Sequence, residues 1–359
     1  MNGMTYGFAD ALRLTLEHII PLPTETVSLL DSVGRIAAED LCALIDSPSM
    51  DSSRKDGYAV RSGEVAGATP DHPVRLRLVG SIAAGGANNI GVIPGTTVRV
   101  LTGACIPDGA DAVVSEEFAS KESHEVLIEN PAAPKNVLPR GGDVSLGQCL
   151  LSKGSSITPV MAGLLAVAGH SRIPVYRSPA IGIVGTGDEI IEPGEPLPEG
   201  KIYASNIITL AGWCRRYGAS ATLALVPDNP DTIFRTLHRL SLETDALITS
   251  GGAWTGDHDM VASVLGSLGW EQVFHRIRIG PGKGVGFGML RGKPVFVLPG
   301  GPPSNLMAFL QIALPGLQAL SGNAHPGLPR ISARLGSDLL GGDRDWTDFF
   351  FGTLSLEGE

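Results

Sequence analysis

Four glycine-rich loops in the second half of the chain contain residue types that bind anions. The loops read Gly185-Thr186-Gly187-Asp188-Glu189, Thr249-Ser250-Gly251-Gly252, Gly280-Pro281-Gly282-Lys283-Gly284 and Pro299-Gly300-Gly301-Pro302-Pro303-Ser304. Glycines let backbone N–H groups approach a ligand closely, and a helix that begins in such a loop adds positive potential. Lys283 supplies a positive charge, and Ser304 stands at the expected start of a helix. One such loop is usually only a strand-to-helix connection, but four in one unit predict a site for phosphate or another oxyanion.

These loops do not complete the common nucleotide-binding signatures. Lys283 is followed by Gly284, so its loop cannot complete the P-loop pattern G-x-x-x-x-G-K-[ST]. The pattern G-x-G-x-x-G does not follow a predicted strand either. The sequence therefore disfavours an ordinary P-loop NTPase and a Rossmann dehydrogenase.

Carboxylates accompany the glycine loops. Those nearest the expected strand ends and helix starts are Asp188, Glu189, Asp228, Asp257 and Asp259. Mg²⁺ takes oxygen ligands and bridges carboxylates to phosphates, so this set predicts Mg²⁺. For Asp228 and Asp257, capping of a helix N-terminus is an equally good explanation. His258 lies between two of the carboxylates, but the i, i+4 ligand pair typical of a transition-metal site is missing, so capping plus Mg²⁺ is favoured.

Two further polar loops occur in the first half of the chain. Asp56-Gly57 leads into an expected strand and reads as a turn, and Thr102-Gly103 reads as a strand end. Spacing alone leaves both a structural and a catalytic role open for these residues.

The elements that would position the anion-binding loops alternate between strand and helix. Apolar runs predict strands at 180–184, 220–226, 245–249 and 294–298. Between and after them, the pattern predicts helices at 203–217, 229–242, 257–268 and 303–320. This alternation is typical of a doubly wound, mainly parallel sheet, in which ligands bind beyond the carboxyl ends of the strands.

The first half of the chain shows a different pattern of expected helices and strands. Helical spacing predicts helices over 8–20, 24–40 and 159–168. Residues 46–143 predict a small β-rich domain, because turn-forming residues separate short apolar runs at 74–80, 97–101, 111–114 and 125–129. Residues 144–178 are expected to pack back on the N-terminal helices, which would make the β-rich domain an insertion. Strand-like pieces at 331–335 and 349–356 are too short for a domain of their own.

Composition excludes several classes of protein. A chain of 359 residues is expected to form two or three domains, and 43% hydrophobic residues exclude a disordered chain. A net charge of −10 argues against a general nucleic-acid binder. The four cysteines form no C-x-x-C pair, which favours reduced thiols of a cytosolic protein over a zinc site or a disulfide framework. We expect no membrane span and a cytoplasmic location, because no run of 18 apolar residues occurs and the N-terminus lacks a signal-peptide pattern.

Further motifs follow one another in register along the chain. They are Lys55-Asp56-Gly57-Tyr58-Ala59-Val60-Arg61, Arg99 to Ala104, Pro107 to Val114, Arg140 to Asp143, and Ile202-Tyr203 with Asn206. Together with the glycine loops, they resemble the MoeA family, the molybdopterin molybdenumtransferases, and the related E domain of gephyrin. The resemblance extends from about residue 8 to residue 335.

The resemblance implies a multidomain α/β fold. It implies a split elongated arm at 1–45 and 144–178, an inserted β-rich domain at 46–143 and a MoaB/MogA-like molybdopterin-binding α/β domain at 179–325. Residues 326–359 would be the beginning of a small C-terminal β domain. It further implies a homodimer whose active site combines the α/β domain of one subunit with the β insertion of the other. Small-molecule substrates and other proteins of molybdenum cofactor biosynthesis are the partners implied, with no nucleic acid and no membrane.

The implied reaction inserts molybdenum: adenylylated molybdopterin and molybdate give molybdenum cofactor and AMP, with Mg²⁺ present. The catalytic group would be Asp56, Thr102 and Asp143. The residues that would bind phosphate, pterin or molybdate are Gly185, Thr186, Gly187, Asp188, Ser250, Gly251, Gly252, Arg276, Pro281, Gly282, Lys283, Pro299, Gly300, Gly301, Pro302 and Ser304. Those that would handle Mg²⁺ are Glu189, Asp228 and Asp259.

The chain departs from the family pattern at the expected oxyanion pocket. Gly284 stands where the family usually has the proline of Lys-Pro-Gly-Lys-Pro, the first lysine of that motif is Gly280, and Gly301 replaces the asparagine of Pro-Gly-Asn-Pro. These changes leave an alternative open. In it, the chain is a paralogue that binds molybdopterin without catalysis, or one that prefers tungstate.

Overall fold

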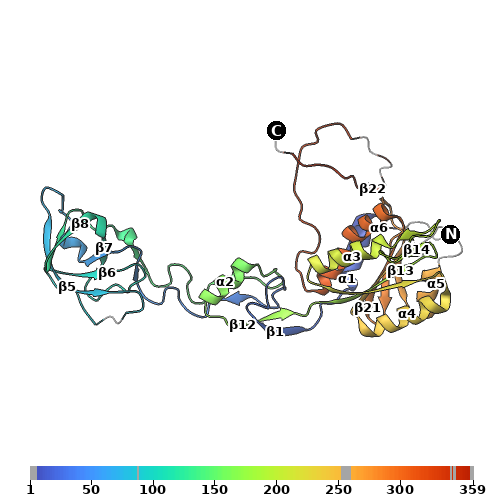
Figure 1. Ribbon diagram of the computed structural model, residues 1–359, viewed down its shortest axis with the longest axis horizontal. Helices are drawn as coiled ribbons and strands as arrows, with labels where there is room; N and C mark the ends of the chain where they lie inside the picture. Colours follow the sequence, from blue (N-terminus) through green and yellow to red (C-terminus); the bar gives the residue numbers. More distant parts are fainter. Residues whose placement is uncertain (1–5, 87–88, 252–259, 340–341, 343–344, 356–359) are drawn as a thin grey trace. The chain divides into compact units, whose positions relative to one another are not determined.

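The computed structural model describes residues 6–86, 89–251, 260–339, 342 and 345–355 (Figure 1). The chain folds into two compact units. The first, which we call the α/β unit, comprises Met1–Glu39, Ser152–Pro159 and Arg172–Glu359. The second, the insertion unit, comprises Asp40–Leu151 and Val160–Ser171. Within the part of the chain that is described, no helix has the length and apolar character needed to span a membrane.

A six-stranded sheet forms the centre of the α/β unit, with the order β16-β13-β17-β21-β20-β18. The strands are β13 (Ala180–Thr186), β16 (Ser220–Val226), β17 (Ala246–Ser250), β18 (Glu271–His275), β20 (Gly286–Leu290) and β21 (Lys293–Leu298). The first four strands in the order are parallel to one another, and β20 runs antiparallel to both of its neighbours, β21 and β18. The predicted doubly wound, mainly parallel sheet is therefore confirmed.

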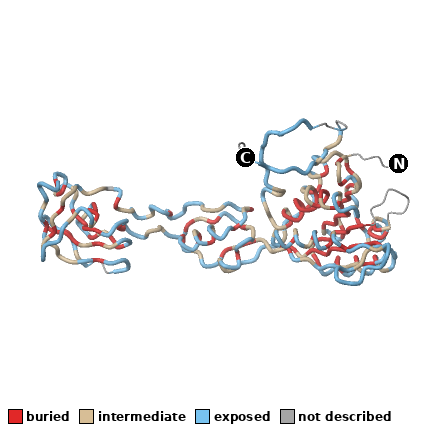
Figure 2. The backbone as a smooth tube through the Cα atoms, turned by 45° about the horizontal axis from the view of Figure 1, so that its top comes forward, coloured by how far each residue is buried: buried red, intermediate tan, exposed pale blue. Residues whose placement is uncertain are grey.

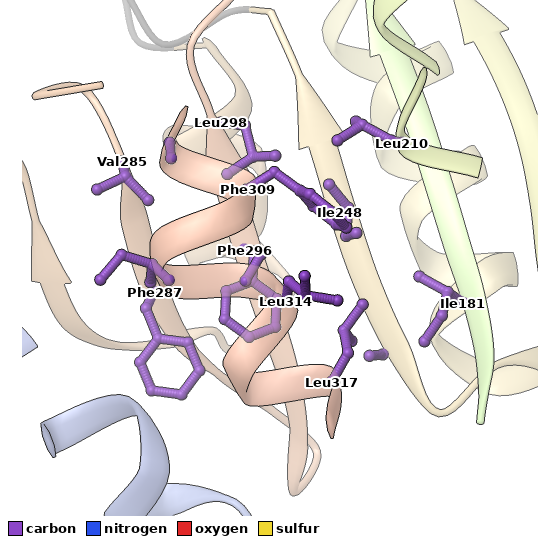
Figure 3. Packing of buried hydrophobic residues seen from close by; sticks show 14 of the residues in the cluster. Ile181, Leu210, Ile248, Val285, Phe287, Phe296, Leu298, Phe309, Leu314 and Leu317 are labelled. Atoms are coloured by element: carbon purple, nitrogen blue, oxygen red, sulfur yellow. The ribbon is translucent and has the colours of Figure 1, made fainter. Parts of the chain in front are cut away.

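Helices cover both faces of this sheet (Figure 1). One face carries α1 (Phe8–His18), α3 (Ser205–Arg216), and the run of α6 (Pro302–Ala308), a π-helical segment (Phe309–Ala313) and α7 (Leu314–Leu320). The other face carries α4 (Pro230–Glu243) and α5 (Met260–Ser267). Each face has its own buried apolar cluster. Figure 3 shows the first cluster, where Phe296 of the sheet lies beside Leu314 of the long helix.

Local sequence explains where these elements begin. The Asn229 side chain accepts a hydrogen bond from the Thr232 backbone N–H at 3.0 Å, and Pro230 occupies the first turn of α4. An asparagine cap followed by proline is a favourable helix start, because proline lacks the N–H that would otherwise stay unpaired. Strand β17 is buried along its whole length, as expected for a strand inside a sheet that helices cover on both faces.

A second six-stranded sheet forms the insertion unit, with the order β7-β4-β6-β5-β9-β8. The strands are β4 (Gly57–Val60), β5 (Val74–Ile82), β6 (Thr96–Val100), β7 (Ala112–Ser115), β8 (Ala119–Glu122) and β9 (Glu125–Ile128). Apolar side chains form clusters on both faces: Tyr58 and Val60 belong to one cluster and Ala59 to the other. Neighbouring residues of β4 thus face opposite sides, as strand geometry requires. The prediction of a β-rich region is confirmed.

Short elements complete the fold. In the α/β unit, β1 (Thr24–Ser28) pairs with β12 (Arg172–Tyr176), β14 (Ile190–Ile191) with β15 (Ile202–Tyr203), and β19 (Ile279–Gly280) with β22 (Thr347–Asp348). In the insertion unit, β2 (Leu41–Cys42) pairs with β11 (Cys149–Leu151), and β3 (Ser52–Ser53) with β10 (Val137–Leu138). Helix α2 spans Pro159–Val167, and short 3₁₀ turns occur at Ser62–Glu64, Glu116–Phe118 and Pro134–Asn136. The β1–β12 pair shows that residues from the 144–178 stretch do pack on the N-terminal segment.

Two local predictions are wrong. Residues 24–40 form β1 and a series of turns, not a helix. Thr24, Thr26 and Val27 are β-branched, which favours a strand, and β12 supplies the partner that local periodicity could not reveal. The piece at 331–335 forms no strand, and neither do residues 349–355; the two-residue β22 ends just before them. Figure 2 shows these C-terminal residues exposed along most of their length, so little apolar surface is buried to hold them in a sheet.

Candidate active site

A pocket of about 470 Å³ lies at the carboxyl ends of three parallel strands of the α/β unit. Strands β13, β17 and β21 end here, and the loops that follow them line the pocket. Because parallel strands present their carboxyl ends at one edge of a sheet, loops distant in sequence meet there. The predicted binding residues that line it are Gly185, Thr186, Glu189, Ser250, Gly251, Pro299, Gly300, Gly301 and Pro302. Its volume is in the range of small-molecule sites.

Two asparagine amides hold Ser250 in the pocket wall. The Asn305 Nδ2 group donates to Ser250 Oγ at 3.0 Å and to the Pro299 carbonyl oxygen at 2.9 Å. The Asn206 Nδ2 group donates to Ser250 Oγ at 3.2 Å and to the Gly300 carbonyl oxygen at 2.7 Å. We call this arrangement the asparagine clamp. Asn305 is buried, with 1% of its surface exposed.

The asparagine clamp fixes which kind of hydrogen bond Ser250 can offer. Backbone carbonyls only accept hydrogen bonds, so those of Pro299 and Gly300 require that the Nδ2 groups, not the side-chain oxygens, face them. Each amide then turns its second N–H toward Ser250 Oγ. A hydroxyl has two acceptor positions and one proton, and both acceptor positions are filled. Ser250 is therefore left as a donor, suited to a phosphate or carbonyl oxygen of a ligand.

The strand end beside Ser250 offers a second hydroxyl. Thr186 Oγ1 is buried and, among the described residues, has no hydrogen-bond partner. Gly251 has φ +101°, and a Cβ atom there would lie 2.3 Å from the Thr186 backbone oxygen. Only glycine lets the loop after β17 pass this close to the end of β13. Because buried polar groups are normally paired, the free Thr186 hydroxyl is a candidate ligand contact.

Carboxylates gather at the edge of this site. The Asp228 backbone N–H donates to Asp188 Oδ1 at 3.1 Å. Burial, followed by the negative charges of Asp188 and Glu189, raises the pKa of the Asp228 carboxyl. Of the three, Glu189 lines the pocket. Among the residues that the structure describes, no group of three or more His, Cys, Asp and Glu side chains is arranged to hold a metal ion by itself.

The residues expected to bind molybdate lie on adjacent segments outside the pocket lining as far as the structure describes it. The backbone N–H of Arg276 donates to the Val285 carbonyl at 2.9 Å, which closes the hairpin that contains Pro281, Gly282 and Lys283. A Cβ atom at Gly282 would lie 3.3 Å from the Ser304 backbone oxygen, so this hairpin packs against the first turns of α6. The Lys283 side chain is exposed.

The predicted catalytic residues belong to the insertion unit, where Asp56 and Thr102 contact each other. Asp56 Oδ1 accepts hydrogen bonds from the Thr102 backbone N–H at 2.7 Å and from its hydroxyl at 2.8 Å. These two hydrogen bonds, the backbone one most, lower the pKa of the Asp56 carboxyl. Asp143 is exposed, and its backbone N–H donates to the Ser47 carbonyl at 3.0 Å.

Two of the predicted site residues lie outside the part of the chain that the structure describes. Two asparagines that contact Ser250 had no role in the sequence-based prediction. Gly252 and Asp259 lie outside the described residues, as do Asp257 and His258. Asn206 appeared only as part of a motif, and Asn305 was missed. The one available signal for Asn305 was an amide within an otherwise apolar helical stretch.

A doubly wound sheet with a pocket at the carboxyl edge defines a cofactor- or nucleotide-binding α/β protein. The family model described as "Probable molybdopterin binding domain" matches residues 182–319, and "MoeA N-terminal region (domain I and II)" matches residues 7–169. The chain therefore belongs to the MoeA family, the molybdopterin molybdenumtransferases, as its motifs suggested, and it is an enzyme of molybdenum cofactor biosynthesis.

Relatives and solved structures agree with this assignment. The chain is 35% identical to molybdopterin molybdenumtransferase 2 of Mycobacterium tuberculosis, covering 88% of this chain and 79% of the relative. It is 34% identical to molybdopterin molybdenumtransferase of Haemophilus influenzae, over 87% and 77% of the two chains. The molybdopterin biosynthesis MoeA protein of Pyrococcus horikosii superimposes with a TM-score of 0.77 at 33% identity, covering 89% of this chain and 81% of that one.

Proposed function

We propose that this enzyme transfers molybdenum from molybdate to adenylylated molybdopterin and releases AMP. The observation that supports this most strongly is the donor hydroxyl of Ser250, held by the asparagine clamp beside the glycine loops of the pocket. Pyrophosphate oxygens accept hydrogen bonds only, so they match a site whose side-chain and backbone groups are arranged to donate. Cleaving the pyrophosphate link requires charge neutralisation on the departing AMP more than a strong base.

The proposed roles follow from the chemistry of each group. The loops at 185–187 and 299–301 and Ser250 bind the phosphates and the pterin, and Arg276, Lys283 and Ser304 hold molybdate. Asp56, held by two hydrogen bonds from Thr102, orients a proton donor or a cation at the reacting phosphate. A carboxylate with a lowered pKa is a weak base, so a positioning and electrostatic role fits it better than proton abstraction.

Mg²⁺ is the cation that the resemblance implies, and the carboxylates fit it. Desolvation, followed by the negative charges of Asp188 and Glu189, raises the pKa of the Asp228 carboxyl, and a divalent cation would neutralise that charge. In proteins, Mg²⁺ commonly takes only one or two carboxylates and completes its shell with phosphate oxygens and water. We propose that Asp228 and Glu189, with Asp259, hold Mg²⁺, which would supply charge neutralisation to the phosphates.

Mg²⁺ affinity should decrease as the pH falls through the raised pKa of Asp228, and this loss should begin at a higher pH than for an ordinary aspartate. Asp228→Asn should weaken Mg²⁺ binding about tenfold or more, as expected when a charge-assisted contact of ~1.5–3 kcal/mol is lost. Calorimetric titration with Mg²⁺ in the presence of AMP measures both effects. Asp231→Asn is the control, because Asp231 is an exposed carboxylate three residues away in α4. Unchanged affinity and pH dependence in Asp228→Asn would remove Asp228 from the proposed ligands.

The direct test of the function is AMP release from adenylylated molybdopterin with Mg²⁺, with molybdate, with tungstate or with neither anion. Release that depends on molybdate is the expected result. Release that depends only on tungstate would favour the tungstate-preferring alternative. Binding of the pterin nucleotide without release under any condition would contradict the proposed transfer.

We further propose a cytoplasmic homodimer in which Asp56 of one copy serves the pocket of the other. This rests on the family resemblance. Other proteins of molybdenum cofactor biosynthesis are proposed as further partners. Sedimentation velocity over a range of concentrations tests the dimer, and a monomer at all of them would contradict it.

A further inference from the structure

Two cysteines that are about a hundred residues apart in sequence face each other in the insertion unit. Cys42 ends β2 and Cys149 begins β11, and the antiparallel register places them directly opposite. Cys42 is half-buried and Cys149 is exposed, whereas Cys105 and Cys214 are buried. The sequence alone gave no sign of this pair, because the cysteines have no short spacing.

The pairing of the two strands brings the cysteines within the range that a disulfide requires. The Ala43 backbone N–H donates to the Gln148 carbonyl at 2.8 Å, and the Gly147 N–H donates to the Ala43 carbonyl at 2.8 Å. The register of the two strands shifts between Cys149 and Leu151, but Cys42 and Cys149 are paired directly opposite each other. Cα atoms of directly opposed residues in antiparallel strands are about 4.5–5.5 Å apart, within the ~4.4–6.8 Å range of disulfides.

The two thiols also influence each other directly. Burial raises the pKa of the Cys42 thiol, and hydrogen bonding with the Cys149 sulfur raises it further. The ring Nε2 of His170 lies 2.8 Å from the Cys42 carbonyl oxygen, which anchors this end of β2 to the segment after α2. The strand pair is thus held from a second side as well as by its own hydrogen bonds.

We propose that Cys42 and Cys149 are a redox site that closes reversibly to an intramolecular disulfide on reaction with a small-molecule disulfide such as oxidised glutathione. The exposed Cys149 thiolate attacks one sulfur of the oxidant, whose S–S bond breaks and releases one thiolate. Cys42, after losing its proton, attacks the Cys149 sulfur and displaces the second thiolate. The two cysteines lose two electrons, the oxidant gains them, and the two thiol protons pass to the two released thiolates. Disulfides in reducing compartments are usually transient or redox-sensing, which fits a reversible pair.

The position of the pair gives the disulfide a structural effect. The chain passes from the α/β unit to the insertion unit between Glu39 and Asp40, and leaves the main part of the insertion unit at Leu151. Strands β2 and β11 are therefore the first and last strands of that segment, and the disulfide would fasten them to each other. Oxidation should therefore slow hydrogen exchange at the Ala43 amide, whose hydrogen bond crosses this pair of strands.

The test uses the full chain, reduced, freed of reductant and then treated with oxidised glutathione. Alkylation after denaturation, intact mass and peptide mapping identify the products. The expected result is loss of two of the four alkylatable thiols, no added glutathione mass, a Cys42–Cys149 cross-linked peptide, and full reversal by dithiothreitol. Cys42→Ser should retain one glutathione on Cys149, because the resolving thiol is missing. Cys149→Ser should react much more slowly.

Cys105→Ser is the matched control, because it removes a buried thiol outside the pair and should still form the disulfide. A wild-type product with glutathione retained on Cys149, with intermolecular dimers, or with four free thiols would overturn the proposal. Circular dichroism confirms that each variant is folded before oxidation, and slower Ala43 exchange must accompany the disulfide in the wild-type protein.

Discussion

Asp56→Asn should lower the rate of AMP release on the order of 10²–10³-fold, as expected for the loss of one preorganised charged group at a reacting phosphate. Binding of adenylylated molybdopterin should change little, because the residues that line the pocket are all unchanged. The carboxylate of Asp56 accepts two hydrogen bonds from Thr102, so an amide at this position loses the charge and must place its oxygen toward the same donors. A turnover assay and a separate calorimetric binding measurement distinguish the two effects.

The chain offers a closely matched control for this substitution. Asp111 also accepts hydrogen bonds from the backbone N–H and the hydroxyl of one residue, Ser62, at 2.6 and 2.8 Å. Its pKa is likewise lowered by those bonds, and it lies in the same unit. Asp111→Asn should therefore reproduce any purely structural cost while leaving AMP release nearly unchanged. Equal losses in both variants would show that the effect of Asp56→Asn comes from the fold, and normal turnover in Asp56→Asn would refute its catalytic role.

Asn305→Ala should destabilise the protein by about 1–3 kcal/mol, the usual cost of leaving buried polar groups unpaired. It should also weaken binding of the pterin nucleotide about tenfold. Without the Asn305 amide, Ser250 Oγ has a free acceptor position and Pro299 a free carbonyl, so the Ser250 proton can turn away from the ligand. Urea denaturation measures the first effect and calorimetric titration the second.

Ser250→Ala separates positioning from direct contact. It removes the donor itself, so Asn305→Ala should cost little further affinity when added to it. The double-mutant cycle should therefore show strong coupling in ligand affinity. Asn206→Ala should weaken binding in the same way with a smaller loss of stability, because Asn206 is only partly buried. If the losses of affinity in Ser250→Ala and Asn305→Ala were additive, the asparagine clamp would not orient the Ser250 hydroxyl for the ligand.

Periodicity predicted the parts of the fold in which the signal is local. Each parallel strand of the α/β unit is a short apolar run between glycine or polar turns, so these strands and the helices between them were found near their observed bounds. Strand β1 was mistaken for helix because its partner β12 follows almost 150 residues later. Pairing over such a separation leaves no mark on the local pattern of five residues.

The part of the candidate site that could be predicted is the set of glycine-rich loops, which are recognisable in the sequence. The loops after β13, β17 and β21 were recognised because glycine, serine and threonine at strand ends are chemically conspicuous. Asn305 was missed because its role exists only after folding brings Ser250 and Pro299 to it. The Cys42–Cys149 pair was also missed, because the two cysteines are brought opposite each other only by the strand register of the folded chain.

The π-helical segment Phe309–Ala313 has a consequence for how this protein is compared with its relatives. Such a segment arises when one extra residue is inserted into an α-helix, and it shifts the faces on its two sides relative to each other. Asn305, before the segment, faces Ser250, while Leu314 and Leu317, after it, pack into the core. A relative that lacked one residue here would have a regular helix, and could keep either the amide or the leucines in place, but not both without further change. An insertion or deletion in this short stretch would therefore disturb either the contact to Ser250 or the packing of the leucines.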